Sequence, residues 1–265
     1  MSRAGECALS HNRKKILVTN DDGINGEGLK VLVDSLRSVC DVYVLAPDSN
    51  RSAVSSKITL GERFRFQKYG ADSYSCSGTP ADCVICALTS PLFGCSFDAV
   101  ISGINAGPNM GTDVIYSGTC AAARQAVLMG IPGIAVSLES CFFDYADSGF
   151  NFKPLADFTA QNLDTLISLC TGEVFVSLNA TSADEYTEAA FASLCSRDYG
   201  DKVSIEHEGG DSFSGLCSAG PLRVAGNADS DYALARSGKI AVSLIYAEPV
   251  LKPMNQKTDF IFGSL

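Results

Sequence analysis

Short apolar runs alternate with segments of helical spacing through the first 140 residues of the chain. The run at 15–19 reads KILVT, and the segment 28–39 places Leu and Val at intervals of three and four residues. Short runs rich in β-branched residues favour strands, whereas apolar residues at this spacing form one face of a helix. The pattern therefore predicts a strand over 15–19 and a helix over 28–39.

Further strands and helices continue the alternation, which predicts an α/β fold with an open, mostly parallel sheet and helices on both faces. One helix starts within GTPADCVICAL, where Thr79 suits the N-cap, Pro80 the first helical position and Asp82 the first turn. We also expect a β-hairpin over 58–77 and a glycine-rich loop over 103–117. The other expected strands cover 41–46, 98–102, 133–138, 173–178 and 239–246, and the other expected helices cover 118–129 and 152–169.

The pattern weakens after about residue 180. Residues 180–238 are rich in Ser, Gly, Asp and Ala and contain only scattered β-like pieces. We therefore expect three parts along the chain. They are a disordered tail over 1–13, an α/β domain over 14–180, and an irregular β-containing extension over 181–265 that completes the same domain.

The composition limits the classes of partner. The 265 residues are 46% hydrophobic and carry a formal net charge of −10 at pH 7. Binding to nucleic-acid phosphates needs clustered Lys and Arg, so no nucleic-acid polymer is expected as a partner. Small phosphorylated ligands remain compatible, because backbone N–H groups and a metal can hold them. No apolar run reaches the roughly 18 residues that span a bilayer, and the first residues lack the apolar stretch of a signal peptide, so we expect a cytoplasmic protein without a membrane partner.

The chain contains eleven cysteines, a high and odd number. They are scattered along the sequence, and without a secretory signal free thiols in a reducing compartment are favoured over disulfides. Cys83 and Cys86 form one C-x-x-C pair, but a structural zinc site needs a second pair at suitable spacing, and the sequence has none. We therefore expect the cysteines to be small core residues.

Polar loops follow three of the predicted strands. In an open α/β sheet, ligands bind outside the carboxyl ends of the strands. The loops NDDGINGEG, PDSNRSAVSS and SGINAGPNMGTDVIYSGT each leave such an end. If these strands are neighbours, the loops share one crevice with very few basic residues. That crevice would hold Asp21, Asp22, Ser52, Asn105, Asn109, Asp113, Ser117 and Thr119.

This set of side chains has more than one interpretation. Hard oxygen ligands suit Mg²⁺, Mn²⁺ or Ca²⁺, and a divalent cation relieves the repulsion between the adjacent carboxylates Asp21 and Asp22. Asn, Asp and Gly also dominate turns, so NDDG can be an Asx-type turn without a metal. Likewise, the helix start at Ser117, Gly118 and Thr119 can bind a phosphate through free N–H groups, or can simply be N-capped. The residues alone leave both choices open.

Other catalytic classes lack their motifs. The chain has no G-x-x-x-x-G-K-[ST] loop and no G-x-S-x-G elbow, and the glycines after the first strand are spaced G-x-x-G-x-G rather than as a dinucleotide fingerprint. Its two histidines, His11 and His207, lie in the expected tail and in the irregular region, which gives a Ser-His-Asp triad little support. What remains is chemistry by a metal and carboxylates on an oxygen-rich substrate.

Five motifs in series resemble the SurE family of survival-protein nucleotidases. They are ILVTNDDGINGEGL, VLAPDSNRSAVSSKITL, SGTPADCV, DAVISGINAGPNMGTDVIYSGTCAAARQA and GIPGIAVSL. They occur in order and with compatible spacing over residues 14–140, which makes the series specific in a way that NDDG alone is not. The segment after Asn179 departs from the family pattern, and the many cysteines are not a family feature.

The resemblance implies a Rossmann-like three-layer α/β domain whose β-rich C-terminal extension forms oligomer contacts, in a homodimer or a homotetramer. It implies a metal-dependent acid phosphatase that acts on nucleoside 5′- and 3′-monophosphates. One divalent cation, Mg²⁺ or Mn²⁺ with Ca²⁺ as an alternative, would be bound by Asp21, Asp22, Ser52 and Asn105. The phosphate contacts implied by the resemblance are Asn109, Ser117, Gly118 and Thr119.

We therefore expect hydrolysis of a phosphomonoester with Asp21 and Asp22 as the catalytic residues. One of them would orient or deprotonate the attacking water, and the other would mainly bind the metal. The sequence does not divide these roles, and it leaves a covalent aspartyl-phosphate open. Two rival functions are a non-catalytic nucleotide-binding or scaffold protein on the same fold and a nucleotide-sugar transferase that uses paired aspartates and a metal. The intact polar set speaks against the scaffold.

Overall fold

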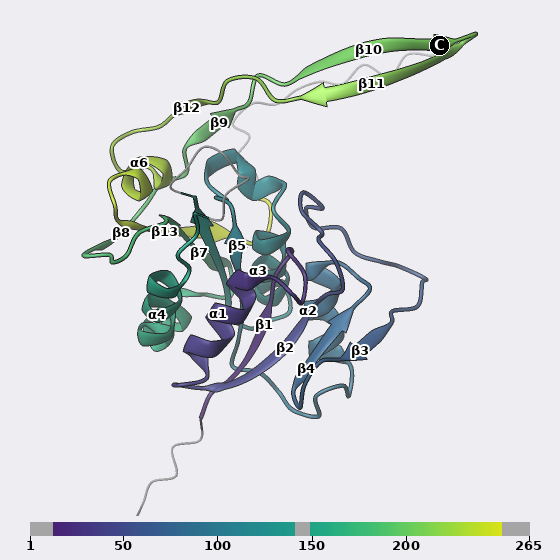
Figure 1. Ribbon diagram of the computed structural model, residues 1–265. Coiled ribbons are helices and arrows are strands. Elements are labelled where there is room, and N and C mark those ends of the chain that lie inside the picture. Colours follow the sequence, from purple (N-terminus) through teal and green to yellow (C-terminus); the bar gives the residue numbers. More distant parts are fainter. Residues whose placement is uncertain (1–12, 141–148, 251–265) are drawn as a thin grey trace, which may run out of the picture.

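The computed structural model describes residues 13–140 and 149–250. A nine-stranded sheet runs through the middle of these residues, helices cover both of its faces, and a two-stranded arm projects from one end (Figure 1). The α/β architecture with a mostly parallel sheet, expected from the sequence, is therefore confirmed.

The bounds of the elements follow in chain order. The main sheet contains β1 (Lys15–Thr19), β2 (Asp41–Pro47), β3 (Phe66–Lys68), β4 (Ser73–Cys76), β5 (Ala99–Ala106), β6 (Gly133–Glu139), β7 (Val174–Thr181), β8 (Ala189–Phe191) and β13 (Ile240–Tyr246). The helices are α1 (Glu27–Leu36), α2 (Pro80–Thr89), the 3₁₀ helix η1 (Gly111–Ile115), α3 (Gly118–Leu128), α4 (Lys153–Gln161), α5 (Leu163–Leu169) and α6 (Asp231–Arg236). Two small sheets are formed by β9 (Ser196–Asp198) with β12 (Arg223–Ala225), and by β10 (Lys202–Gly209) with β11 (Ser212–Ser218).

The strand order of the main sheet is β3-β4-β2-β1-β5-β6-β7-β13-β8, and the strands from β4 to β7 in this order are parallel. From β1 the chain builds the sheet to one side through β2 and β4, and then returns to the other side of β1 with β5. Sheets of this kind bind ligands at the carboxyl ends of the strands where the order reverses. Here that point lies between β1 and β5, next to the two adjacent aspartates.

Side chains of the central strands alternate between the two faces of the sheet. In β1, Ile16 and Val18 pack in the cluster that contains residues of α1, α4 and α5, whereas Leu17 packs with residues of α2 and α3. All three are fully buried. Because successive strand residues point to opposite faces, a strand that is apolar at every position is buried on both sides. α1, α4 and α5 therefore cover one face, and α2 and α3 cover the other (Figure 1).

The start of α2 agrees with the capping signals in the sequence. The Thr79 hydroxyl accepts the N–H of Asp82 at 3.2 Å, and the Asp82 carboxylate accepts the N–H of Thr79 at 2.9 Å. This reciprocal capping box satisfies two N–H groups that the helix itself leaves free. Pro80 occupies the first turn, as predicted.

Several predicted boundaries are wrong by a few residues. α1 ends at Leu36 rather than at Val39, and Val39 is 45% exposed. The Ser38 hydroxyl donates to the Ser35 carbonyl at 2.7 Å, where the chain leaves the helix towards β2. Side chain to backbone bonds of this kind compete with the helical ladder, which explains the early end.

The helix predicted over 152–169 is two helices. Asn162 lies between α4 and α5, and its side-chain nitrogen donates to the Phe158 carbonyl at 2.9 Å. The hairpin predicted over 58–77 is confined to β3 and β4, which pair antiparallel. β4 also pairs in parallel with β2 and so widens the main sheet, a contact that the local pattern did not predict.

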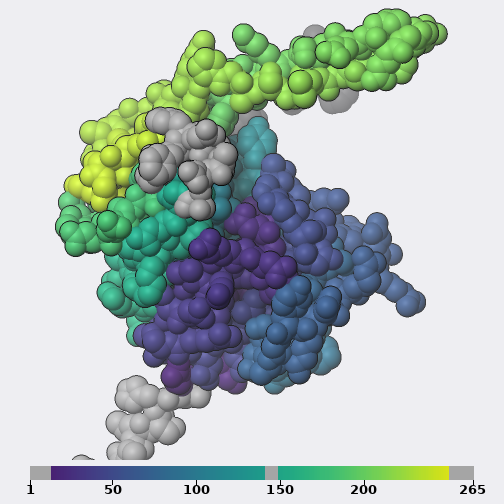
Figure 2. Space-filling model, viewed as in Figure 1, coloured from purple at the N-terminus to yellow at the C-terminus, as the bar shows by residue number. Residues whose placement is uncertain are grey.

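Part of the chain after residue 181 returns to the main sheet. β13 pairs antiparallel with β7, and β8 pairs in parallel with β13. β9 and β12 pair with each other and lead into the hairpin of β10 and β11, which projects into solvent as an arm (Figures 1 and 2). The division into a domain and an extension stays a prediction. The expected tail, apart from Arg13, lies outside the described residues.

The nine cysteines in the described part of the chain are free. Six of them are buried, and Cys76, Cys83 and Cys86 pack together with apolar residues on the α2 side of the sheet. Among the described residues, no group of three or more His, Cys, Asp or Glu side chains is arranged to hold a metal ion. The C-x-x-C pair therefore contributes to the packing of the core.

Gly28 brings the first turn of α1 against β5. A Cβ atom at this position would lie 2.0 Å from the Ile104 carbonyl oxygen and 3.1 Å from the Phe152 ring. Only glycine allows so close an approach of the two backbones. The packing of α1, and with it the turn that precedes α1, depends on this contact.

We expect Gly28→Ala to lower the free energy of unfolding by about 1–3 kcal/mol, because the added methyl group displaces α1 from β5. Gly172→Ala is the matched control, since a Cβ there meets nothing within 4 Å, and it should change stability by less than about 0.5 kcal/mol. Urea unfolding of both variants measures the difference. Equal stability of the two would show that α1 can shift without loss.

Candidate active site

The NDDG segment after β1 is a tight turn. The side-chain nitrogen of Asn20 donates to the Gly23 carbonyl at 2.9 Å, and its side-chain oxygen accepts the Gly23 N–H at 3.1 Å. Asn20 is fully buried, so the turn belongs to the edge of the core. The turn therefore fixes the two aspartates between its ends, and the turn interpretation and the metal interpretation are compatible.

Asp21 is buried, with 3% of its surface exposed. Its Oδ1 accepts a hydrogen bond from the Thr119 hydroxyl at 2.6 Å. Its backbone carbonyl accepts the N–H of Arg51 at 2.7 Å. The structure thus brings together the loop after β1, the loop after β2 and the start of α3, which supply three parts of the expected crevice.

Asp22 is half-buried and contacts the end of β5, where its Oδ2 accepts the Ala106 N–H at 3.2 Å. β5 runs to Ala106 instead of ending at Ser102, and its register against β6 is irregular between Ser102 and Asn105. Irregularities of this kind redirect side chains next to functional sites. The side-chain nitrogen of Asn105 donates to the Gly107 carbonyl at 2.8 Å, which leaves its Oδ1 as the atom available to a cation.

Burial raises the pKa of both carboxyls. For Asp21 it raises the pKa to about 6, while the Thr119 hydrogen bond lowers this pKa and the charge of Asp22 raises it. For Asp22, burial raises the pKa and the Ala106 N–H lowers it. No basic side chain among residues 13–140 and 149–250 contributes to either pKa. Two adjacent carboxylates in this setting are costly to ionise, and a nearby cation would favour their charged form.

α3 begins directly against Asp21. Ser117 is its N-cap, and the Ser117 hydroxyl oxygen accepts the Cys120 N–H at 3.0 Å. A Cβ atom at Gly118 would lie 2.9 Å from the Asp21 Cβ, so a residue without a side chain is needed here. N–H groups in the first turn of a helix, together with the helix dipole, favour an anion such as a phosphate.

Ser52 is the exposed member of the expected set. Within the described residues its hydroxyl makes no hydrogen bond to either aspartate, so the structure places it beside the site rather than in contact with it. Its neighbour Arg51 holds the Asp21 carbonyl. In the same loop, the Ser55 N–H donates to the Tyr116 carbonyl at 2.9 Å, which connects the loop after β2 to the segment before α3.

Asn109 is 7% exposed and belongs to a buried polar network. Its side-chain nitrogen donates to the Ser137 hydroxyl at 2.8 Å. Its backbone N–H donates to the Asn179 Oδ1 at 2.9 Å, and its carbonyl accepts from the Asn179 Nδ2 at 3.1 Å. Ser137 and Asn179 were not predicted from the sequence as residues of the site. The available signal was that both are polar residues near the carboxyl ends of predicted strands.

Asp113, also expected in the crevice, lies in η1. The Tyr199 hydroxyl donates to its Oδ2 at 2.7 Å, and the Arg197 Nη1 lies 3.0 Å from the same oxygen. Burial raises the pKa of Asp113, whereas the Tyr199 hydrogen bond and the Arg197 charge lower it. Arg197 and Tyr199 come from the region where the sequence pattern was weak, and no spacing or motif pointed to them.

The chemistry of the donor set suits a hard divalent cation. The two carboxylates, the Asn105 amide oxygen and the Ser52 hydroxyl all present oxygen, which Mg²⁺, Mn²⁺ and Ca²⁺ prefer. Asp21 and Asp22 are adjacent and, in the described part of the chain, without a basic partner, so a bound cation would offset the cost of their charge. The chemistry of the residues present is thus consistent with a metal site.

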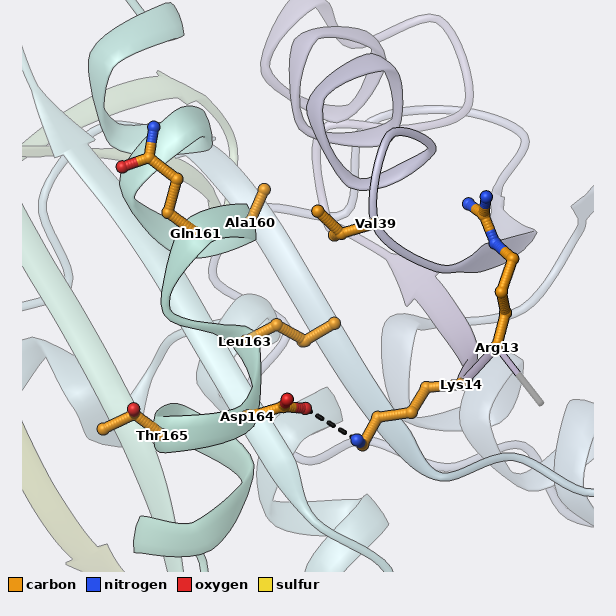
Figure 3. Close-up of a pocket in the computed structure, with 8 residues that line it drawn as sticks. All are labelled: Arg13, Lys14, Val39, Ala160, Gln161, Leu163, Asp164 and Thr165. Carbon is orange, nitrogen blue, oxygen red and sulfur yellow. Dashed lines mark ion pairs between the residues drawn. The ribbon is translucent and has the colours of Figure 1, made fainter. Parts of the chain in front are cut away.

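A separate hollow of about 320 Å³ lies near the other end of β1 (Figure 3). Its two basic residues are already paired, Lys14 with Asp164 at 2.6 Å and Arg13 with Asp41 at 3.1 Å. Lys14 immediately precedes β1, so this hollow is at the amino ends of the strands. Ligands of α/β sheets bind at the carboxyl ends, and the candidate site is therefore the group of loops around Asp21 and Asp22.

Comparisons with known proteins agree on one family. The family model described as Survival protein SurE matches residues 16–201. A 5′-nucleotidase SurE of Treponema pallidum (strain Nichols) is 44% identical over 187 residues, which make up 69% of this chain and 99% of that protein. A 5′-nucleotidase SurE of Haemophilus influenzae (strain PittGG) is 54% identical over 125 residues, 47% of this chain and 50% of that protein. The crystal structure of a SurE protein from Aquifex aeolicus has a TM-score of 0.76 at 26% identity, covering 89% of this chain and 94% of that chain.

The raised pKa of Asp21 makes the stability of the metal-free protein depend on pH. Its pKa in the folded state is about 6, above the ordinary value of 3.8. The folded state therefore binds the proton more tightly than the unfolded state, and stability falls as the pH rises from about 4 to about 6. In EDTA, Asp21→Asn should be more stable than the wild type by about 2–3 kcal/mol at pH 7 and should lose this advantage at pH 4.

Urea unfolding at the two pH values measures this effect. Asp201→Asn removes an exposed carboxylate and is the control for the change in net charge; it should shift stability by less than about 0.5 kcal/mol at either pH. A wild type that is as stable as Asp21→Asn at pH 7 would mean that burial does not penalise the Asp21 charge.

Proposed function

The chain belongs to the SurE family, and we propose that it is a metal-dependent phosphomonoesterase that hydrolyses nucleoside 5′- or 3′-monophosphates to a nucleoside and phosphate. One observation carries the proposal. The Thr119 hydroxyl lies 2.6 Å from the Asp21 carboxylate, so the start of α3 lies directly beside the aspartate pair. A cation bound to the acids and a phosphate bound at the helix start would be neighbours there.

We assign the metal ligands as Asp21, Asp22, Ser52 and Asn105, for one Mg²⁺ or Mn²⁺, with Ca²⁺ as the third candidate. When bound, a divalent cation neutralises charge on the phosphate and lowers the pKa of a coordinated water. Ser52 would have to turn its exposed hydroxyl into the crevice. The adjoining backbone is held by the Arg51 N–H on Asp21, which keeps Ser52 in a segment next to that aspartate.

The phosphate contacts are assigned to Asn109, Ser117, Gly118 and Thr119. Thr119 donates its hydroxyl to Asp21, and its backbone N–H also lowers the pKa of that carboxyl, so a phosphate would share these donors with Asp21. The side-chain nitrogen of Asn109 carries two hydrogens, of which one is used on Ser137 and the other is available to a phosphate oxygen. Donors fixed in this way lose little freedom when the ligand binds, which favours binding in a single orientation.

The two aspartates differ in a way that divides their roles. Asp21 is the more buried, and Thr119 fixes its carboxylate from the helix start. Asp22 is half-buried and has one carboxylate oxygen on the Ala106 N–H. We therefore assign Asp21 mainly to metal binding and Asp22 to orienting or deprotonating the attacking water. Phosphoryl transfer depends mostly on positioning and electrostatics, which suits a site without a titrating histidine.

The arm supports an oligomer, for which we propose a homodimer or a homotetramer. Val203, Ile205, Phe213 and Leu216 in β10 and β11 are each more than 60% exposed. An isolated two-stranded hairpin with apolar side chains in water is marginally stable, so we expect another copy of the chain to cover these side chains.

No helix in the described ranges is long and apolar enough to cross a membrane. We propose a cytoplasmic location.

A non-catalytic scaffold on the same fold is the alternative, and no observation favours it.

Asp22→Asn should reduce turnover of AMP and of p-nitrophenyl phosphate at least about 100-fold with saturating Mn²⁺ or Mg²⁺, because it removes the charge that activates the water. EDTA should abolish wild-type turnover. The control Asp201→Asn should keep wild-type rates. Wild-type turnover by Asp22→Asn would sink the metal-carboxylate mechanism.

Ser117→Ala should weaken binding of inorganic phosphate about 3- to 10-fold, since the helix start loses its capping hydroxyl. Binding of Mn²⁺ should be unchanged. Calorimetry with each ligand separates the two effects, and Ser168→Ala on α5, whose exposed hydroxyl donates to the Thr165 carbonyl, serves as the control. If Ser117→Ala weakens Mn²⁺ binding more than phosphate binding, the division of the site into metal and phosphate ligands is wrong.

A further inference from the structure

The turn that leads into α3 is built around Asp113. The Asp113 carbonyl accepts the N–H of Tyr116 at 3.0 Å and the N–H of Ser117 at 3.1 Å. Ser117 is the N-cap of α3 and belongs to the proposed phosphate site. Contacts that fix the position of Asp113 therefore also fix the start of α3.

The side chain of Asp113 is held by two residues from the far part of the sequence. Its Oδ2 accepts the Tyr199 hydroxyl at 2.7 Å and lies 3.0 Å from the Arg197 Nη1. The Arg197 side chain is only 3% exposed, and that of Asp113 is 15% exposed. Solvent and salt screen a pair at this depth much less than a surface pair.

Arg197 is a costly residue for simple packing. Its Nε makes no hydrogen bond within the described part of the chain, its Nη1 is held by the charge of Asp113, and the centre of the Tyr199 ring lies 5.5 Å from the guanidinium. Buried N–H groups without acceptors cost free energy, and a well-packed apolar residue often replaces a buried ion pair without loss. The charge at this position therefore points to a role beyond filling space.

Two further residues of η1 contact the part of the chain beyond residue 190. The Thr112 hydroxyl donates to the Arg197 carbonyl at 2.9 Å and accepts the Arg197 N–H at 3.1 Å. The Gly111 N–H donates to the Asp231 carboxylate at 2.6 Å. Three successive residues of η1 are thus anchored to residues beyond 190. Figure 1 shows β9, which carries Arg197, continuing into the arm.

We infer that Arg197 and Tyr199 are positioning residues of the phosphate site, which act through the Asp113 carboxylate to hold the start of α3 beside Asp21. That the ligand is a phosphate rests on the function proposed above. The contacts of Asp113 with Arg197 and Tyr199 are observed independently of that function. Arg197 in β9 and Tyr199 directly after it thereby contribute to the site without having to touch the substrate.

The first test is Tyr199→Phe, which removes only the hydroxyl. Calorimetry with inorganic phosphate in the presence of Mn²⁺ should show phosphate affinity reduced about 3- to 10-fold, the loss expected for one hydrogen bond, with Mn²⁺ affinity unchanged. Tyr69→Phe is the control, because Tyr69 is 50% exposed in the β3–β4 turn. A Tyr199→Phe variant that binds phosphate like the wild type overturns the inference.

A double-mutant cycle then separates positioning from direct contact. If Tyr199 acts through Asp113, Tyr199→Phe should have no further effect on phosphate affinity in an Asp113→Ala background. An undiminished effect in that background would mean that Tyr199 acts on the ligand directly, and the inference would be wrong. Should Asp113→Ala not fold, the cycle of Asp113→Asn with Arg197→Met applies the same criterion, and Arg197→Lys should restore part of the affinity.

The calorimetric readout needs no turnover, so the two proposals can fail independently. A wild type that binds phosphate but hydrolyses no phosphomonoester overturns the proposed function, and the cycle still decides the inference. An active wild type whose phosphate affinity is unaffected by Tyr199→Phe overturns the inference and leaves the function standing.

Discussion

The buried carboxylate of Asp21 is the constraint on which the rest of the site depends. It sits at the carboxyl end of β1 with 3% of its surface exposed, and its carboxylate accepts the hydroxyl of Thr119, 98 positions away. Burial penalises the charge of a group in this position, and a nearby cation would offset that penalty. The glycine at 118 and the backbone contact from Arg51 are consequences of fitting three chain segments around that carboxylate.

Residues from later parts of the chain hold the loops that meet at Asp21. Asn179 at the end of β7 fixes the backbone of Asn109 on both sides, and the region beyond residue 190 fixes η1 through Asp113. Each support consists of a buried polar group whose partner lies far along the chain. Because such groups cost free energy unless they are paired, they define one arrangement of the loops and disfavour the alternatives. The proposed phosphate site is in this sense a product of segments that lie far apart along the chain.

Much of the fold could be predicted because its signals are local. The strand at 15–19 and the capping box at Thr79 depend on neighbouring residues only, and the structure has both where the sequence places them. The break at Asn162, the pairing of β4 with β2 and the extension of β5 to Ala106 were not predicted, since they depend on contacts with other elements. For the site, the polar loops and the family resemblance pointed to Asp21, Asp22, Asn105 and Ser117. They gave no sign of Asn179, Arg197 or Tyr199, which contribute by contact rather than by motif.

The sequence by itself determined the alternation of strands and helices, the turn chemistry of NDDG and the oxygen-rich character of the loops, because periodicity and side-chain chemistry are properties of short segments. Only the tertiary structure decided which aspartate is buried, which helix start faces it and which distant residues hold that helix start. These features follow from burial and from contacts between residues 84 to 98 positions apart, such as Asp22 with Ala106 and Asp21 with Thr119. A pKa of about 6 for Asp21 is therefore a property of the packed chain, since desolvation arises only when other segments exclude water from the carboxylate.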